Sequence, residues 1–224
     1  MEQPGGAMEP ESLPAGRERP IGRGPKVRAA VLSATLAELA ETGYAGLTVD
    51  NVAQRAGVHK TTVYRRWKDR EALVLDALTE QVAADIPIPD THAVETDLRE
   101  LARSLVRMLT SPADRAVTIA MFSDAARVPE IGDVKRRFFA DRFLRAEPVV
   151  TRAVERGELP AGTDPAELLK TLIAPIYLRL LITAEPVDET TADHAAQVAL
   201  AAARAGALHP AGRERPSPAA GRSR

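Results

Sequence analysis

The chain has 224 residues, of which 45% are hydrophobic and 27% charged, and its formal net charge is −1. This composition excludes a chain that is disordered throughout. The absence of cysteine excludes disulfides and thiolate chemistry, and no apolar run reaches the roughly 20 residues that a membrane helix needs. Because the first residues also lack the apolar core of a secretory signal, we expect a cytoplasmic protein with no membrane partner.

Residues 1–24 and 209–224 are rich in Gly, Pro, Ser and Arg, and we predict a disordered arm and a disordered tail there. Between them the apolar spacing is helical almost throughout, and no alternating stretch is flanked by hairpin turn residues. The sequence therefore predicts an all-α protein of about nine helices. We divide it into a small helical unit at 25–70 and a larger one at 71–208.

Charge is distributed unevenly along the chain. From Arg17 to Arg70 there are 11 Lys or Arg residues against 5 Asp or Glu, a local net charge of +6, so the remainder is acidic. This asymmetry indicates one module that faces a polyanion and another with a different role.

Glycine and proline predict where helices end. The first helix is expected to begin at Pro25 or Lys26 and to stop at Gly43. The two prolines within 86–90 separate a helix ending near Asp85 from one starting near residue 93. Further boundaries are predicted at Ser111–Pro112, Val128–Pro129, Leu159–Pro160 and Glu185–Pro186, with a kink at Pro175.

Two short helices joined by a glycine are predicted within Leu47–Leu73. An N-cap, one apolar face and a glycine stop define the first of them: Thr48, then Val49, Val52, Ala53 and Ala56, then Gly57. A second short helix must begin near Lys60, because Val63 and Trp67 share a face at i, i+4 spacing. This pattern is typical of a helix-turn-helix.

The remaining face of that second helix carries cationic and hydroxyl-bearing side chains, with no acidic residue before Asp69. Such side chains reach phosphate oxygens and base edges when a helix lies in the major groove of DNA. The face consists of Lys60, Thr61, Thr62, Tyr64, Arg65 and Lys68. We therefore predict contact with double-stranded DNA.

The segment resembles the DNA-binding signature of the tetracycline-repressor (TetR) family over about residues 26–76. The resemblance rests on Leu47-Thr48-Val49, Val52-Ala53, Ala56-Gly57-Val58, Thr62-Val63-Tyr64, Trp67, Glu71 and Leu73, preceded by Gly43-Tyr44. It implies a DNA-contacting set of Thr48, Lys60, Thr61, Thr62, Tyr64, Arg65 and Lys68, with Val63 and Trp67 in the core. It also implies an N-terminal three-helix DNA-binding domain followed by a helical ligand-binding and dimerisation domain.

Three positions depart from the family pattern. His59 stands at the N-cap of the second helix where the family commonly has Ser, and we expect it to contact phosphate instead. Trp67 replaces the common Phe, and Arg70 replaces the usual Lys beside Asp69, a suitable N-cap for the next helix. The arm residues Arg17, Arg19, Arg23 and Lys26 either contact DNA or remain solvated; the sequence leaves both readings open.

The last two predicted helices have broad apolar faces. The family analogy implies that they pack against their copies as a four-helix bundle, because a single helix-turn-helix reads few base pairs and such proteins dimerise. The predicted dimer interface is Leu169, Leu172, Ile173, Ile176, Leu180, Ala192, Ala195, Ala196, Ala199 and Ala203. The alternative is that these residues only cover the core of the monomer.

A cavity for an unknown small-molecule effector is predicted in the middle of the chain, where Met and aromatic residues gather. The candidates are Met108, Met121, Phe122, Phe138, Phe139 and Phe143, with Tyr177. Ordinary core packing is the alternative for each of them.

Catalytic chemistry has no support in the sequence. The four histidines are dispersed, and no HExxH, GxxxxGK[ST], GxGxxG or GxSxG motif occurs, so we predict no enzyme activity, no metal and no cofactor. The sequence favours a ligand-responsive regulator, a repressor that binds a palindromic operator as a homodimer. The alternatives are a DNA-binding protein without a ligand, and a helical enzyme or binding module whose helix-turn-helix is vestigial.

Overall fold

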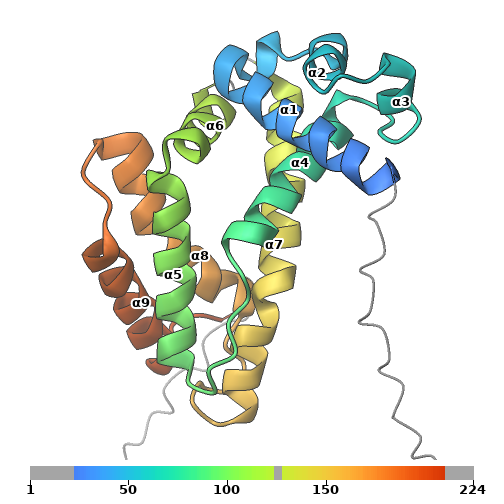
Figure 1. The fold of residues 1–224 in the computed structure, drawn as a ribbon. Coiled ribbons are helices and arrows are strands. Elements are labelled where there is room, and N and C mark those ends of the chain that lie inside the picture. Colours follow the sequence, from blue (N-terminus) through green and yellow to red (C-terminus); the bar gives the residue numbers. More distant parts are fainter. Residues whose placement is uncertain (1–22, 124–127, 210–224) are drawn as a thin grey trace, which may run out of the picture.

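The computed structural model describes residues 23–123 and 128–209, and within those ranges the chain is helical and contains no strand (Figure 1). The predicted all-α class is confirmed, while the predicted arm and tail lie almost wholly outside the described residues. No helix in the described ranges is long and apolar enough to cross a membrane. In chain order the helices are α1 (Arg23–Gly46), α2 (Val49–Arg55), α3 (Lys60–Tyr64), α4 (Arg70–Asp85), α5 (Val94–Thr110), α6 (Pro112–Ser123), α7 (Pro129–Glu155), α8 (Pro165–Leu178), the π-helical turn η2 (Arg179–Thr183) and α9 (Glu189–Arg204).

Glycine and proline set several helix ends at the predicted positions. The backbone of α1 leaves helical geometry at Gly43, where φ is +70°, a value that glycine adopts without steric cost. α4 ends at Asp85, as predicted, and α5 begins at Val94. Proline stands at the start of three further helices, where its missing N–H costs nothing: Pro112, Pro129 and Pro165.

α8 contains Pro175 and passes directly into η2. The π-helical turn ends at Ala184, whose φ of +54° places a non-glycine residue in the left-handed region. The irregular backbone that the structure shows therefore lies one turn beyond the proline at which the sequence predicts a kink.

Two apolar cores hold the described residues together, and α4 contributes to both. Leu73, Val74 and Leu78 of α4 lie in the first core, with side chains of α1, α2 and α3. Val82 lies in the second core, with side chains of α5, α7, α8 and α9, and so does Ile86 immediately after α4. α4 is therefore a structural link between α1 to α3 and the rest of the chain.

The first core extends beyond the predicted boundary at residue 70. α1 packs along α6, and the core around α1 to α3 includes Val117 and Met121 of α6 and Ile131 and Val134 of α7. In Figure 1, α2 and α3 lie at one end of the molecule next to α1, and α6 lies on the other side of that end. The helices from the middle of the chain thus support the helix-turn-helix through α1 and α4.

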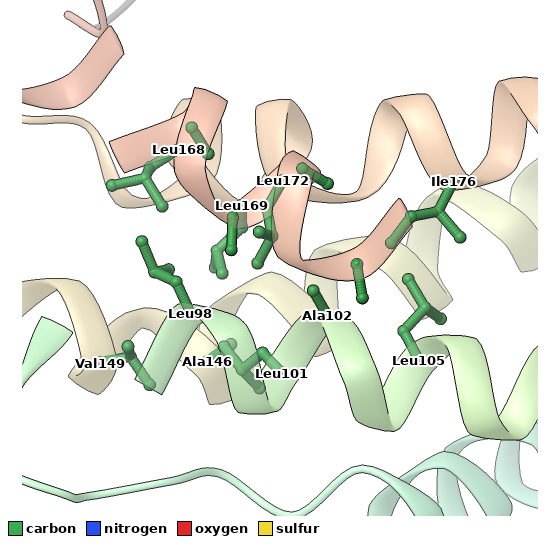
Figure 2. Close-up of a cluster of buried hydrophobic side chains, with 14 of the residues drawn as sticks. Leu98, Leu101, Ala102, Leu105, Ala146, Val149, Leu168, Leu169, Leu172 and Ile176 are labelled. Atoms are coloured by element: carbon green, nitrogen blue, oxygen red, sulfur yellow. The ribbon is translucent and has the colours of Figure 1, made fainter. Parts of the chain in front are cut away.

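The apolar faces of α8 and α9 point into the core of their own chain. Figure 2 shows Leu168, Leu169, Leu172 and Ile176 of α8 beside Leu98 and Leu105 of α5. Nine of the ten predicted interface residues are buried within the single chain, and Ile173 is partly buried; the nine are Leu169, Leu172, Ile176, Leu180, Ala192, Ala195, Ala196, Ala199 and Ala203. These residues therefore pack within their own chain, where α5 and α8 cover the alanine stripe of α9, and their role in a dimer interface stays a prediction.

Other apolar side chains of this region do face outward. Leu178 at the end of α8 is 52% exposed, Ile182 of η2 is 74% exposed and Val198 of α9 is 46% exposed. Removing large aliphatic side chains from water lowers the free energy, so these three positions are unfavourably exposed apolar surface on α8, η2 and α9.

Candidate nucleic-acid interface

α2 is fixed at both ends by local hydrogen bonds. At its start the Thr48 hydroxyl accepts a hydrogen bond from the Asn51 N–H at 3.2 Å, as its predicted N-cap role requires. At its end Gly57 has a φ of +67° and donates to the Gln54 carbonyl at 3.1 Å. No atom lies within 4 Å of the position a Cβ would take at Gly57, so the backbone conformation, rather than space, requires glycine.

α3 begins at the N-cap His59. Its Nδ1 accepts a long hydrogen bond of 3.5 Å from the Thr61 N–H and lies 3.0 Å from the Thr61 hydroxyl. The helical turn continues beyond Tyr64, because the Trp67 N–H donates to the Val63 carbonyl at 2.9 Å. A single short rod therefore runs from residue 60 to residue 67, as the sequence predicts.

The inner side of α3 is held by Val63 and Trp67, both buried, and by one carboxylate. The indole N–H of Trp67 donates to Asp76 on α4, and the other oxygen of Asp76 is 2.7 Å from the guanidinium of Arg28 on α1. Three helices thus meet at Asp76, which fixes the rotation of α3 and hence the side that it presents to solvent.

Two more polar clusters fasten α2 and α4 to α1. Arg55 at the end of α2 pairs with Glu38 at 2.8 Å and also with Glu41. Tyr44 is fully buried, its hydroxyl donates to Glu71 at 3.1 Å, and burial raises the pKa of this phenol to about 12. The predicted N-cap of α4 is confirmed, since Asp69 accepts from the Ala72 N–H at 2.8 Å.

The outer side of α3 carries the predicted DNA-contacting residues. Thr48, His59, Lys60, Thr61, Tyr64, Arg65 and Lys68 are exposed, and Thr62 is partly buried. Lys60 is 3.5 Å from the carboxylate of Asp50, itself exposed. The structure thus brings the predicted set together on one end of the molecule.

One cation of this surface is missing from the set that the sequence predicts. Arg66 is exposed, and its guanidinium lies 5.6 Å from the centre of the Trp67 ring. Within the part of the chain that the structure describes, Arg65, Arg66 and Lys68 form no ion pair. The predicted contact face did not include Arg66, although this residue contributes to the local net charge of +6 and directly precedes the buried Trp67. Of the predicted arm residues, Arg17 and Arg19 lie outside the described ranges, and Lys26 is exposed at the start of α1.

This arrangement suits a polyanion. Three cations without acidic partners, the exposed hydroxyl of Thr61 and the exposed phenol of Tyr64 lie on or directly after a rod whose opposite side is fixed in a core. An α-helix fits the major groove of B-DNA, where Arg and Lys donate to guanine and to phosphate oxygens.

The seven predicted pocket residues meet in the second half of the chain. They line two neighbouring cavities of about 50 Å³ each. Phe143 lines the first, Met121 and Phe122 line the second, and the walls of both include Met108, Phe138, Phe139 and Tyr177. The first cavity also contains the guanidinium-bearing residue Arg142, which the sequence did not single out.

Two family models match separate parts of the chain. Residues 31–77 match the family model described as bacterial regulatory proteins, tetR family, and residues 88–199 match the tetracyclin repressor-like C-terminal domain. The first span contains α2 and α3 with the exposed cations, and the second contains α5 to α8 with most of the cavity walls.

Individual relatives extend over most of the chain. The HTH-type transcriptional regulator AqdR of Rhodococcus erythropolis is 35% identical over 168 residues, which cover 74% of this chain and 81% of that protein. The DNA-binding transcriptional repressor TetR of Mycobacteroides abscessus is 30% identical over 175 residues, covering 75% and 89%. The crystal structure of the TetR family transcription regulator SCO0332 is similar at a TM-score of 0.66 and 30% identity, covering 83% of this chain and 100% of that one. The chain therefore belongs to the TetR family, and it is a transcriptional regulator with an N-terminal helix-turn-helix DNA-binding domain.

Proposed function

We propose that this regulator is a repressor that binds a palindromic operator as a homodimer and responds to a small molecule bound between α4, α5, α7 and α8. The observation that carries the proposal is the outer side of α3 and the residues that directly follow it, where Arg65, Arg66 and Lys68 are exposed and have no acidic partner among the described residues.

The side chains of α3 divide into two roles. Lys60 at the start of the rod and Arg65 directly after Tyr64 are suited to base edges, where a bidentate Arg–guanine contact discriminates by about 1 to 3 kcal/mol. Arg66 and Lys68, beyond the end of α3, are suited to phosphate oxygens, which fix the register of the protein on the duplex. His59 and Thr48, at the starts of the two helices, are placed to donate to phosphates in the same way.

The proposal of a dimer rests on the few base pairs that a single helix-turn-helix can read. Two recognition helices placed about 34 to 36 Å apart would enter successive major grooves on one side of the duplex. The outward-facing Leu178, Ile182 and Val198 support a dimer surface on α8, η2 and α9 that differs from the one that the sequence predicts.

The ligand response is supported by the position of α4. Its first half lies in the DNA-binding core, and Val82 and Ile86 at its other end line the first cavity. A ligand that displaces these two side chains changes the tilt of the helix that carries Asp76 and hence α3. A coupling of about 1 to 3 kcal/mol between ligand and DNA is typical of such systems.

The test is an electrophoretic shift assay with the purified chain and the DNA that flanks its own gene. We expect a specific complex that is lost or weakened at least tenfold in Lys60→Ala, Tyr64→Ala and Arg65→Ala, while Lys170→Ala, an exposed lysine of α8, binds as the parent does. Unchanged binding by the three α3 variants would remove α3 as the recognition helix.

A regulator without a small-molecule ligand is the second candidate, and the small cavity volumes favour it. Each cavity holds about 50 Å³, whereas pockets for drug-sized ligands are roughly 300 to 1,000 Å³. Native mass spectrometry of the protein purified from its host separates the two candidates, because only the first predicts a co-purified small molecule that dissociates the DNA complex.

A further inference from the structure

One charged side chain lines an otherwise apolar cavity. The first cavity is enclosed by aliphatic and aromatic side chains of α4, α5, α7 and α8, among them Val82, Leu105, Phe139 and Phe143. Arg142 of α7 is the one charged residue in its wall, and Tyr177 of α8 contributes the one hydroxyl. An apolar pocket with a few converging polar groups is the usual form of a small-molecule site.

Arg142 has no acidic partner among the described residues. The neighbouring Asp141 pairs instead with Arg145, whose Nε lies 2.6 Å from the carboxylate. The guanidinium of Arg142 donates one hydrogen bond, from Nη2 to the Ile86 carbonyl at 2.9 Å, and the structure shows no other for it. Burial, and then the like charge of Arg145, lower the pKa of Arg142, but a guanidinium stays protonated in proteins.

Arg142 is partly buried and has no counter-ion among the described residues, so an anion in the cavity can pair with its charge with less competition from water than at a fully exposed site. Four of the five N–H groups of a guanidinium in this position are free for a ligand, and a planar fork of this kind matches the two oxygens of a carboxylate. The positive charge of Arg142 therefore favours a ligand that carries a negatively charged group.

Tyr177 adds a second donor. Its hydroxyl makes no hydrogen bond to the described residues, and burial raises its pKa to about 12, so that it remains protonated at neutral pH. A protonated phenol donates to an anion and thereby adds to the preference that Arg142 sets.

We propose that the effector is a small aromatic or aliphatic monoanion, whose acidic group is bound by Arg142 and Tyr177 and whose apolar body lies among the phenylalanines. This inference rests on the proposed ligand response and specifies its chemistry. A neutral compound of the same shape would leave the guanidinium unpaired, and an amine would be repelled by it.

A ligand body larger than either cavity needs the two spaces to join. The first and second cavities are separated by residues common to both walls, including Met108, Phe138 and Phe139. Rotation of these side chains joins the two spaces, and the flexible Met108 suits such a change. A single ring on a short chain is therefore a suitable probe.

The experiment titrates the full chain with three compounds of one skeleton: 4-phenylbutyrate, 4-phenylbutanol and 4-phenylbutylamine. We expect calorimetry to show binding of the acid at least tenfold tighter than that of the alcohol and no binding of the amine. Arg142→Gln, which keeps a donor for the Ile86 carbonyl but no charge, should lower the affinity for the acid about ten- to a hundredfold and abolish the preference over the alcohol.

Two controls separate this proposal from the proposed function. Arg145→Gln removes a neighbouring exposed cation of the same helix and should bind the acid as the parent does, and Arg142→Lys should retain the preference for the acid. Failure of the acid to bind, equal affinity for acid and alcohol, or unchanged binding by Arg142→Gln overturns the monoanion assignment. DNA binding of the unliganded parent chain and of the three arginine variants is measured in parallel, and absence of DNA binding by the parent chain would instead count against the proposed repressor function.

Discussion

The indole Nε1 of Trp67 donates to the Oδ2 of Asp76 across 2.9 Å, joining the end of α3 to the middle of α4. The same carboxylate pairs with Arg28 of α1 through its other oxygen. Asp76 therefore connects α1 and α4 to the end of α3 and fixes the orientation of α3. Trp67, Asp76 and Arg28 act in this way without being placed to contact DNA themselves.

Removing the indole donor should weaken this junction. Trp67→Phe keeps an aromatic ring in the core but leaves one oxygen of Asp76 without its partner, so we expect the free energy of unfolding to fall by about 1 kcal/mol or somewhat more. Urea denaturation followed by circular dichroism measures the change. Tyr64→Phe is the matched control, since the Tyr64 ring is exposed and should alter stability by less than about 0.5 kcal/mol.

Phosphate contacts make DNA affinity depend on salt. If Lys68 contacts one phosphate, Lys68→Ala should reduce the slope of log affinity against log salt concentration by about 0.9 and weaken specific and nonspecific DNA alike. Fluorescence anisotropy at several salt concentrations gives the slope. Lys170→Ala on α8 should leave it unchanged, and equal slopes for the parent chain and Lys68→Ala would remove the phosphate role.

The turn between α2 and α3 depends on a left-handed residue. Gly57→Ala places a Cβ at φ +67°, where the strain costs about 1 to 2 kcal/mol although no neighbouring atom is in the way. Gly57→Asn should cost less, because Asn tolerates this conformation. Thermal melts of the two variants test the ranking, and an alanine variant as stable as the asparagine variant would show that the turn does not need this geometry.

The proposed dimer surface is testable with one charged substitution. Leu178→Arg places a cation in the outward apolar patch of α8 and should shift the protein towards monomer in size-exclusion chromatography with light scattering. Leu144→Arg is the control, because Leu144 of α7 is 67% exposed and lies beside Pro165, Ala166 and Lys170 at the start of α8 rather than beside Leu178 at its end. A dimer that persists in Leu178→Arg at low micromolar concentration would place the interface elsewhere.

Stability should decline in acid through Glu158, near the end of α7. Its carboxylate accepts a hydrogen bond from the Val94 N–H at 2.7 Å, and this bond, followed by Arg156, lowers the pKa of Glu158 below its ordinary value of 4.5. A lowered native pKa means that the stabilisation is present above about pH 4.5 and is lost as the pH falls through the native pKa. Glu158→Gln should flatten that part of a stability–pH curve; an unaltered curve would contradict the role of this bond.

The DNA-binding helices were predictable because their signals are local. The N-caps Thr48 and Asp69, the glycine at residue 57 and the spacing of Val63 and Trp67 all act within a few residues of one another. The junction at Asp76 was not predictable, since it joins Arg28 to a residue 48 positions away and nothing in the spacing of either indicates the other.

The surfaces of α8 and α9 show the opposite case. Periodicity correctly identified their apolar faces, but it does not say whether an apolar face is covered by the same chain or by a second copy. The alanine stripe of α9 is covered by α5, a helix from a much earlier part of the chain. Leu178 and Val198, in contrast, are exposed to solvent. Arg142 was likewise one of many charged residues on α7 until the fold placed it in a cavity wall.

The common core of α1 to α3 with α6 and α7 has a consequence for protein engineering. A segment cut after α4 and joined to a foreign effector domain would lose Val117, Met121, Ile131 and Val134. The apolar side chains of α1 and α4 that pack in the same core would then be exposed to water. A fusion that uses α1 to α4 therefore has to include α6 and the first turns of α7, or the foreign effector domain has to supply helices that fill the same volume.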